Sequence, residues 1–131
     1  MMQLILIIAT ALHILSAVAW AGFTFTLART AASNVETLFV PQLGAGTAAI
    51  LAGGWLWSLT HEGAFGLAEK VLAFGALAAV AALAIQLVAV GPVIRRLRDD
   101  PQLRGRAAIG QRIAAGLLVI AIICMASARY V

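Results

Sequence analysis

Charged residues are scarce in this chain, and carboxylates are missing from the interior of its apolar stretches. Only 11% of the 131 residues are charged and 63% are hydrophobic, with a mean hydropathy of +1.04. Soluble domains carry about 25% charged residues, so this composition excludes an ordinary soluble domain. The five acidic residues all lie in or beside expected loops: Glu36, Glu62, Glu69, Asp99 and Asp100. A proton relay through carboxylates inside a membrane is therefore excluded.

Cysteine is nearly absent as well. Cys124 is the single cysteine, so an internal disulfide is impossible. The sequence also lacks a phosphate-binding Walker motif, a Ser/His/Asp set and a carboxylate pair. These absences remove the common nucleotide-hydrolysing and hydrolytic chemistries from consideration.

Long apolar stretches dominate what is present. They cover residues 3–28, 38–60, 67–93 and 107–129, and each exceeds the roughly 20 residues that a helix needs to cross a hydrocarbon layer of about 30 Å. Helices are expected because the hydrocarbon offers no water to satisfy backbone groups. We predict an all-α fold: an integral membrane four-helix bundle forming one transmembrane domain over residues 1–131.

The distribution of basic residues predicts the orientation of the bundle. The connections after the first and third stretches hold most of the nine basic residues: Arg29, Arg95, Arg96, Arg98, Arg104, Arg106 and Arg112. Lys70 and Arg129 lie on the other side. Basic loops favour the cytoplasmic face, so both termini are expected on the outer (periplasmic) side of a bacterial inner (cytoplasmic) membrane. The basic loops suit contact with anionic membrane lipid and are too short for a nucleic-acid site.

A histidine interrupts the first apolar stretch, in LHILSAVAWAGFTF (residues 12–25). Ten residues separate it from Gln3, about 15 Å along a helix, which places it near the bilayer centre. Ionisable groups at that depth usually serve a function. The alternative is a neutral histidine bonded to a nearby hydroxyl or carbonyl. Steps of three or four residues put four further side chains on its face: Ser16, Trp20, Thr24 and Leu27.

The spacing H-x6-W-x-G, formed by His13, Trp20 and Gly22, is followed by two phenylalanines. It resembles the first helix of CopD-type membrane proteins, as the terminal MASARY resembles the end of small members of that group. The chain is also distantly similar to HemJ-type protoporphyrinogen oxidases, in which a lysine opens the third helix as Lys70 does here. The resemblance implies haem b or copper.

Neutral imidazole is a common axial ligand of haem iron, so His13 is the expected ligand. Ser16 and Trp20 are expected beside the haem, and Lys70 and Arg129 are expected to pair with its propionates. The corresponding function is electron transfer or porphyrin-linked redox chemistry with a redox partner. Whether the protein turns over a substrate stays open.

A second axial ligand is not evident within one chain. At the expected depth of His13, the other three helices carry Ile50, Ala79 and Leu118, and none of these side chains can coordinate iron. His61 lies about 15 Å closer to the outer surface by helical rise. A five-coordinate haem, or one shared by His13 residues of two chains, is expected instead. The small residues of GAGTAAILAGG also favour a homo-oligomer, and a dimer is expected.

Two other functions remain open. Soft donors expected near the outer side suit copper(I), with His61 as the alternative metal ligand; they are Met1, Met2, His61, Cys124 and Met125. The other open function is that of a structural subunit in a membrane complex. Gln86, a polar residue within the third stretch, is expected to bond to a neighbouring helix.

Overall fold

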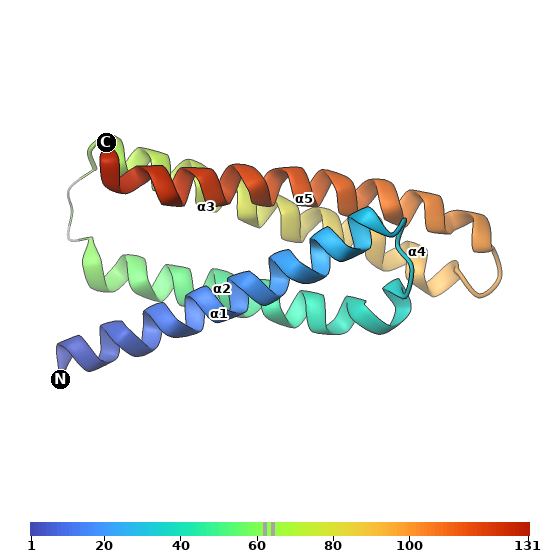
Figure 1. Cartoon of the computed structure of the whole chain (residues 1–131), viewed down its shortest axis with the longest axis horizontal. Coiled ribbons are helices and arrows are strands. Elements are labelled where there is room, and N and C mark those ends of the chain that lie inside the picture. Colours follow the sequence, from blue (N-terminus) through green and yellow to red (C-terminus); the bar gives the residue numbers. More distant parts are fainter. Residues whose placement is uncertain (62, 64) are drawn as a thin grey trace.

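The computed structural model describes every residue except 62 and 64, so the loop position expected for Glu62 lies outside the described part (Figure 1). Four helices are long and apolar enough to cross a membrane, which confirms an all-helical, multi-pass membrane protein. No strand occurs elsewhere in the described chain. In chain order the elements are α1 (Met2–Arg29), α2 (Val35–Thr60), α3 (Leu67–Ile85), η1 (Gln86–Val90), α4 (Gly91–Arg96), η2 (Pro101–Leu103), α5 (Arg104–Ser127) and η3 (Ala128–Tyr130).

The second span begins earlier than the sequence suggested. α2 starts at Val35 rather than near residue 38, after a tight turn in which Ala31, Ala32 and Asn34 have φ values of 52°, 62° and 63°. Pro41 consequently lies inside the helix and not in its first turn. This turn explains the early start of α2, because its left-handed residues reverse the chain directly after α1.

The third span extends to Arg96, past residue 93 where the sequence predicted its end. It continues through the π-helical turn η1 into α4, and the Gly91 N–H donates to the carbonyl of Gln86, five residues earlier. Proline lacks an N–H and its ring crowds the preceding turn. The wider π turn accommodates it without stopping the helix. The charged connection is consequently short, and only residues 97–100 lie between α4 and η2.

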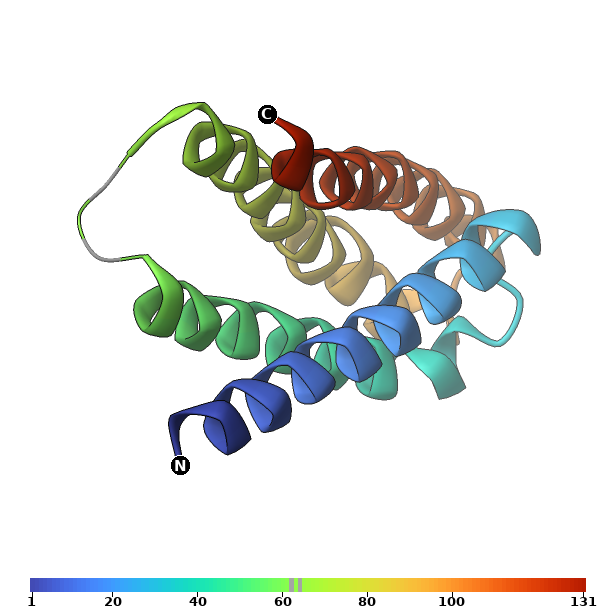
Figure 2. The same cartoon turned by 60° about the vertical axis from the view of Figure 1, so that its left-hand side comes forward.

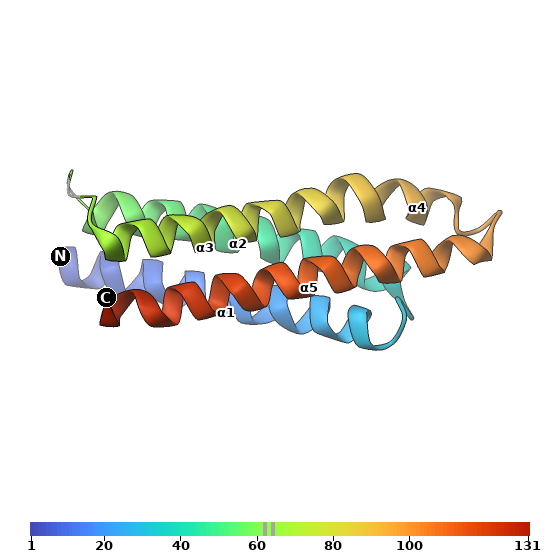
Figure 3. The ribbon, with the colours of Figure 1, turned by 90° about the horizontal axis from the view of Figure 1, so that it is seen from above.

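The spans form two pairs. α1 lies along α2, and α3 lies along α5, whereas α2 and α3 have few contacts with each other. The pairs come together toward α4 and separate toward the end that carries both termini (Figures 1 and 2). Seen from above, both termini lie at the same end of the bundle (Figure 3). An opening between the pairs at that end follows from this divergence.

Ionic and polar contacts hold the α4 end. The Arg104 guanidinium forms an ion pair with Glu36 and donates to the carbonyl of Ala32 at 2.8 Å. Arg112 donates from Nε to the carbonyl of Ala28 at 3.3 Å. These contacts tie the start of α5 to the turn between α1 and α2. The apolar core continues inward from there and is rich in alanine, which lets membrane helices approach closely.

Candidate functional site

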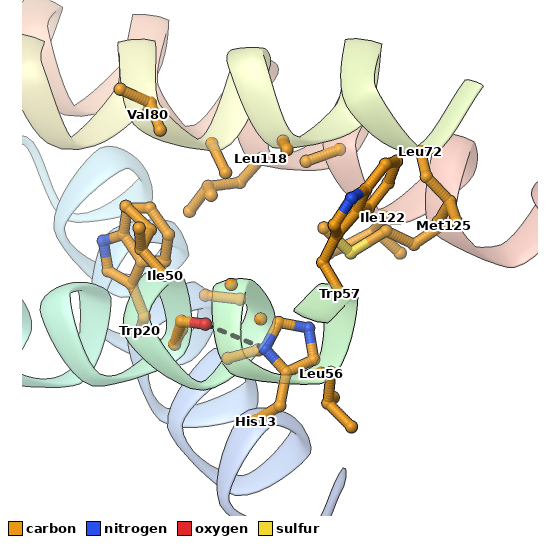
Figure 4. Close-up of a pocket in the computed structure, with 18 of the residues that line it drawn as sticks. His13, Trp20, Ile50, Leu56, Trp57, Leu72, Val80, Leu118, Ile122 and Met125 are labelled. Carbon is orange, nitrogen blue, oxygen red and sulfur yellow. Dashed lines mark hydrogen bonds between the residues drawn. The ribbon is translucent and has the colours of Figure 1, made fainter. Parts of the chain in front are cut away.

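A cavity of about 510 Å³ lies between the two helix pairs at their diverging end (Figure 4). Ligand sites typically enclose about 300–1,000 Å³. All four spans line the cavity, mostly with apolar side chains. The polar, sulfur-containing and aromatic residues in the lining are His13, Trp20, Trp57, Thr60, His61 and Met125. The cavity is therefore large enough for a small-molecule ligand of largely apolar surface.

Part of the lining is also exposed on the flank of the bundle. Gly54 of α2 and Ala76 and Val80 of α3 line the cavity and are exposed. These residues border the gap where α2 and α3 have few contacts. The cavity thus opens onto an apolar flank between α2 and α3.

His13 projects into this cavity with one nitrogen already bonded. Its Nδ1 lies 2.8 Å from the carbonyl oxygen of Ala49 on α2 (Figure 4). Because a carbonyl only accepts, Nδ1 must carry the hydrogen, and in neutral imidazole Nε2 then holds the lone pair. Histidines that bind metals commonly donate their other N–H to a carbonyl in this way. The contact leaves Nε2 as the nitrogen able to coordinate.

Two adjacent glycines on α2 have different relations to His13. A Cβ added at Gly53 would lie 3.0 Å from Cε1 and 3.3 Å from Nδ1 of the imidazole, whereas one at Gly54 would meet nothing within 4 Å. Gly53 therefore makes room for the histidine ring. Gly54 contributes open space to the cavity.

Trp20 forms the floor of the cavity on the α4 side. Its side chain is buried, and its Nε1 donates to Oε1 of Gln86 at 2.8 Å. A Cβ at Gly46 would lie 2.8 Å from Cε2 of the indole, so only glycine leaves space for the ring there. The expected bond from Gln86 to a neighbouring helix is confirmed. Trp20, one of the predicted site residues, reaches the cavity.

On the α4 side of Trp20 lies a set of fully buried polar side chains, which we call the amide cluster: Thr24, Gln42, Gln86 and Gln111. Gln42 and Gln111 exchange Nε2-to-Oε1 bonds of 2.8 and 3.0 Å. Both Gln42 and Gln86 donate to the Thr24 hydroxyl at 3.0 Å. The cluster joins all four spans, and polar bonds of this kind hold helices together in apolar surroundings.

His61 lies at the end of the same cavity that is nearer the chain termini. It follows α2 and stacks on Trp57, with ring centres 4.4 Å apart and an interplanar angle of 21°. Its Nδ1 lies 2.8 Å from the Thr60 hydroxyl. His61 is eight residues beyond Gly53, the neighbour of His13, or about 12 Å along a helix. The two histidines thus line one cavity at different depths.

The other predicted residues lie outside the cavity lining. The Ser16 hydroxyl donates to the Leu12 carbonyl at 2.6 Å, within its own helix. Lys70 is exposed in the first turn of α3. Arg129 is exposed, and its guanidinium carbon lies 5.1 Å from the ring centre of Tyr130. The cofactor-binding roles of these three residues stay predictions.

The expected copper donors are only partly brought together. His61 and Met125 line the cavity, whereas Met1 and Met2 are exposed at the chain start. Cys124 faces α3, where a Cβ at Gly75 would lie 2.9 Å from its own Cβ. Within the described residues, no group of three or more His, Cys, Asp or Glu side chains is arranged to hold a metal ion.

These observations define a multi-pass helical membrane protein with an apolar cavity into which one membrane-embedded histidine projects. No family model, no curated protein and no solved structure matches the chain. The similarity to CopD-type and HemJ-type proteins therefore stays a prediction from the sequence.

Proposed function

We propose that this protein binds haem b in the cavity, with Nε2 of His13 as the axial ligand, and serves electron transfer or porphyrin-linked redox chemistry. The observation that carries the proposal is the 2.8 Å contact between His13 Nδ1 and the Ala49 carbonyl. It selects the tautomer that coordinates a metal through Nε2. We further propose the orientation argued from the basic loops, with both termini outside a bacterial inner membrane.

The lining of the cavity is compatible with a flat apolar macrocycle. Its volume of about 510 Å³ lies in the range of ligand sites, and small side chains at Ala49, Gly53 and Gly54 keep it open beside the histidine. Bound haem would supply a one-electron couple at its iron. The protein would orient the imidazole through Ala49 and exclude water from most of the site.

One protein ligand to iron is expected from each chain. Across the cavity from His13 lie Val80, Leu118 and Ile122, whose side chains cannot coordinate (Figure 4). His61 is about 12 Å away along α2. A single axial histidine, or two supplied by a pair of chains, fits this arrangement, and measuring the mass of the haem-loaded protein in detergent distinguishes them.

Arg129 is the better candidate of the two expected propionate partners. It follows Met125, Ile122 and Leu118 by four, seven and eleven residues, the spacing of one helix face, and those three residues line the cavity. Lys70 precedes the lining residue Leu72 by two positions, which is about 200° around a helix. We therefore expect Arg129→Ala to weaken haem binding more than Lys70→Ala.

The absorption spectrum tests the proposal directly. Protein expressed with ample haem should show a Soret band that shifts on reduction with dithionite. The band should be lost in His13→Ala. It should be kept in His61→Ala, the matched control that removes the other histidine of the cavity. A colourless wild-type protein, or an unchanged spectrum in His13→Ala, would contradict the proposal.

Copper handling is the second candidate, because His61 and Met125 both line the cavity. Imidazole and thioether donors suit copper(I). Titration with copper(I) in the absence of haem should then show binding that His61→Ala removes. A protein that binds neither haem nor copper would leave the structural-subunit hypothesis.

A further inference from the structure

The amide cluster has no part in holding iron, yet one of its members contacts the cavity floor. Gln86 is fully buried and is the first residue of the π-helical turn η1. A residue added to a helical turn rotates the following side chains by about 100°. π turns inside α-helices frequently occur at functional sites. The contacts of Gln86 therefore need an explanation beyond helix packing.

Hydrogen bonds fix the orientation of the Gln86 side chain. Its Nε2 donates to the Thr24 hydroxyl at 3.0 Å and more weakly to Gln111 Oε1 at 3.4 Å. Gln111 Oε1 also accepts from Gln42 Nε2 at 2.8 Å, so it is an acceptor on that side. With its amino group turned toward these oxygens, Gln86 must present Oε1 to the indole of Trp20. The cluster thus determines which atom the indole meets.

The indole is also confined by α2. Gly46 lies against the ring so closely that a Cβ would reach 2.8 Å from Cε2. Trp20 also lines the cavity, seven residues and about 10 Å along α1 from His13. Without the bond to Gln86, the indole N–H would have no partner in this apolar region. The ring would then be free to turn toward the cavity, where space exists.

We propose that Gln86 is a positioning residue, which holds Trp20 as the floor of the cavity and so sets the depth available to a ligand beside His13. The placement of Trp20 stands independently of the cofactor. The effect on ligand depth rests on the proposed haem function. Gln42 offers a matched control, since it belongs to the same cluster and has no hydrogen bond to Trp20.

The first test observes Trp20 alone. Replacing Trp55 and Trp57 by phenylalanine leaves Trp20 as the one tryptophan of the three. Ultraviolet resonance Raman of the full chain then reports the indole N–H bond. Gln86→Met should give the signature of an unbonded N–H, whereas Gln42→Met should keep the bonded one. An unchanged signature in Gln86→Met would overturn the proposal.

The second test uses haem and chains that keep all tryptophans. Both glutamine variants should unfold at lower temperature, because both lose cluster bonds. Gln86→Met alone should shift the Soret band and weaken haem binding by roughly tenfold, the ratio expected for one buried hydrogen bond. In a Trp20→Phe background, which lacks the donor, Gln86→Met should cause no further spectral change.

The outcomes separate the two proposals. Equal spectral changes in Gln86→Met and Gln42→Met would show that the cluster is only structural and would overturn the positioning role. Wild-type protein that binds no haem would refute the proposed function. The Raman signature would still decide whether Gln86 holds Trp20.

Discussion

Replacing Gly53 by alanine should impair the histidine site while leaving the helix intact. The added Cβ would lie 3.0 Å from Cε1 and 3.3 Å from Nδ1 of His13. Ordinary carbon contacts are about 3.5–4.0 Å, so the imidazole must move by a few tenths of an ångström. That movement lengthens the 2.8 Å contact between Nδ1 and the Ala49 carbonyl. Nε2 loses the orientation that we propose for coordination.

The expected energies separate binding from stability. Crowding costs about 1–3 kcal/mol, whereas alanine favours a helix over glycine by about 1 kcal/mol. The net change in unfolding free energy is therefore small, at most about 2 kcal/mol. Haem affinity should fall by roughly tenfold for each 1.4 kcal/mol of lost alignment.

Gly44→Ala is the matched control for this prediction, because Gly44 lies on the same helix but outside the cavity lining, and its Cβ would meet nothing within 4 Å. It should keep the wild-type spectrum and gain up to about 1 kcal/mol of stability. The assay is haem titration followed by absorbance, with thermal unfolding in the same detergent. Wild-type affinity and spectrum in Gly53→Ala would refute the role assigned to this histidine.

The remaining predictions concern stability, measured by thermal unfolding. Ala31→Gly should stabilise the protein by about 1 kcal/mol, because φ is 52° at this exposed position. Glu36→Ala should cost under about 1 kcal/mol, as expected for an exposed ion pair. Arg104→Ala should cost about 1 kcal/mol more, since it also removes the bond to the Ala32 carbonyl. Gln42→Leu should cost about 1–3 kcal/mol by leaving cluster partners unpaired. Equal losses in the two ion-pair variants, or wild-type stability in the Gln42 variant, would contradict these assignments.

Much of the fold could be predicted because hydropathy and length alone define a span. Ile50, Ala79 and Leu118, which were expected level with His13, line the same cavity as the histidine. The polar face of α1 turns inward as expected, with Trp20 buried. The sequence position of a residue predicts which face of its helix it occupies and how far along the span it lies, because both follow from regular helical geometry.

The amide cluster was not predictable in the same way. Gln42 and Gln111 each lie only four residues after the helix starts expected at residues 38 and 107, so the sequence did not single them out. Both helices begin three residues earlier, and both side chains are fully buried. Their partners come from other spans, and no local pattern fixes the register between helices.

The continuation past Pro92 was missed for a related reason. Proline usually ends a helix, and that local rule takes no account of the packing on either side. Here Val90 and Val93 are both buried in the core at the α4 end. Continuing the helix buries these side chains, and the π turn is the backbone adjustment that permits it.

The divergence of the helix pairs gives the protein a wedge shape across the membrane. The pairs meet near α4 and stand apart at the end with both termini (Figures 1 and 2). Any change in their separation therefore alters the area that the protein occupies in one leaflet and hardly at all in the other. Retention of the proposed haem should consequently respond to lateral pressure in that leaflet. Lipids that crowd it would favour closure of the wedge, and lipids that relax it would favour the open cavity.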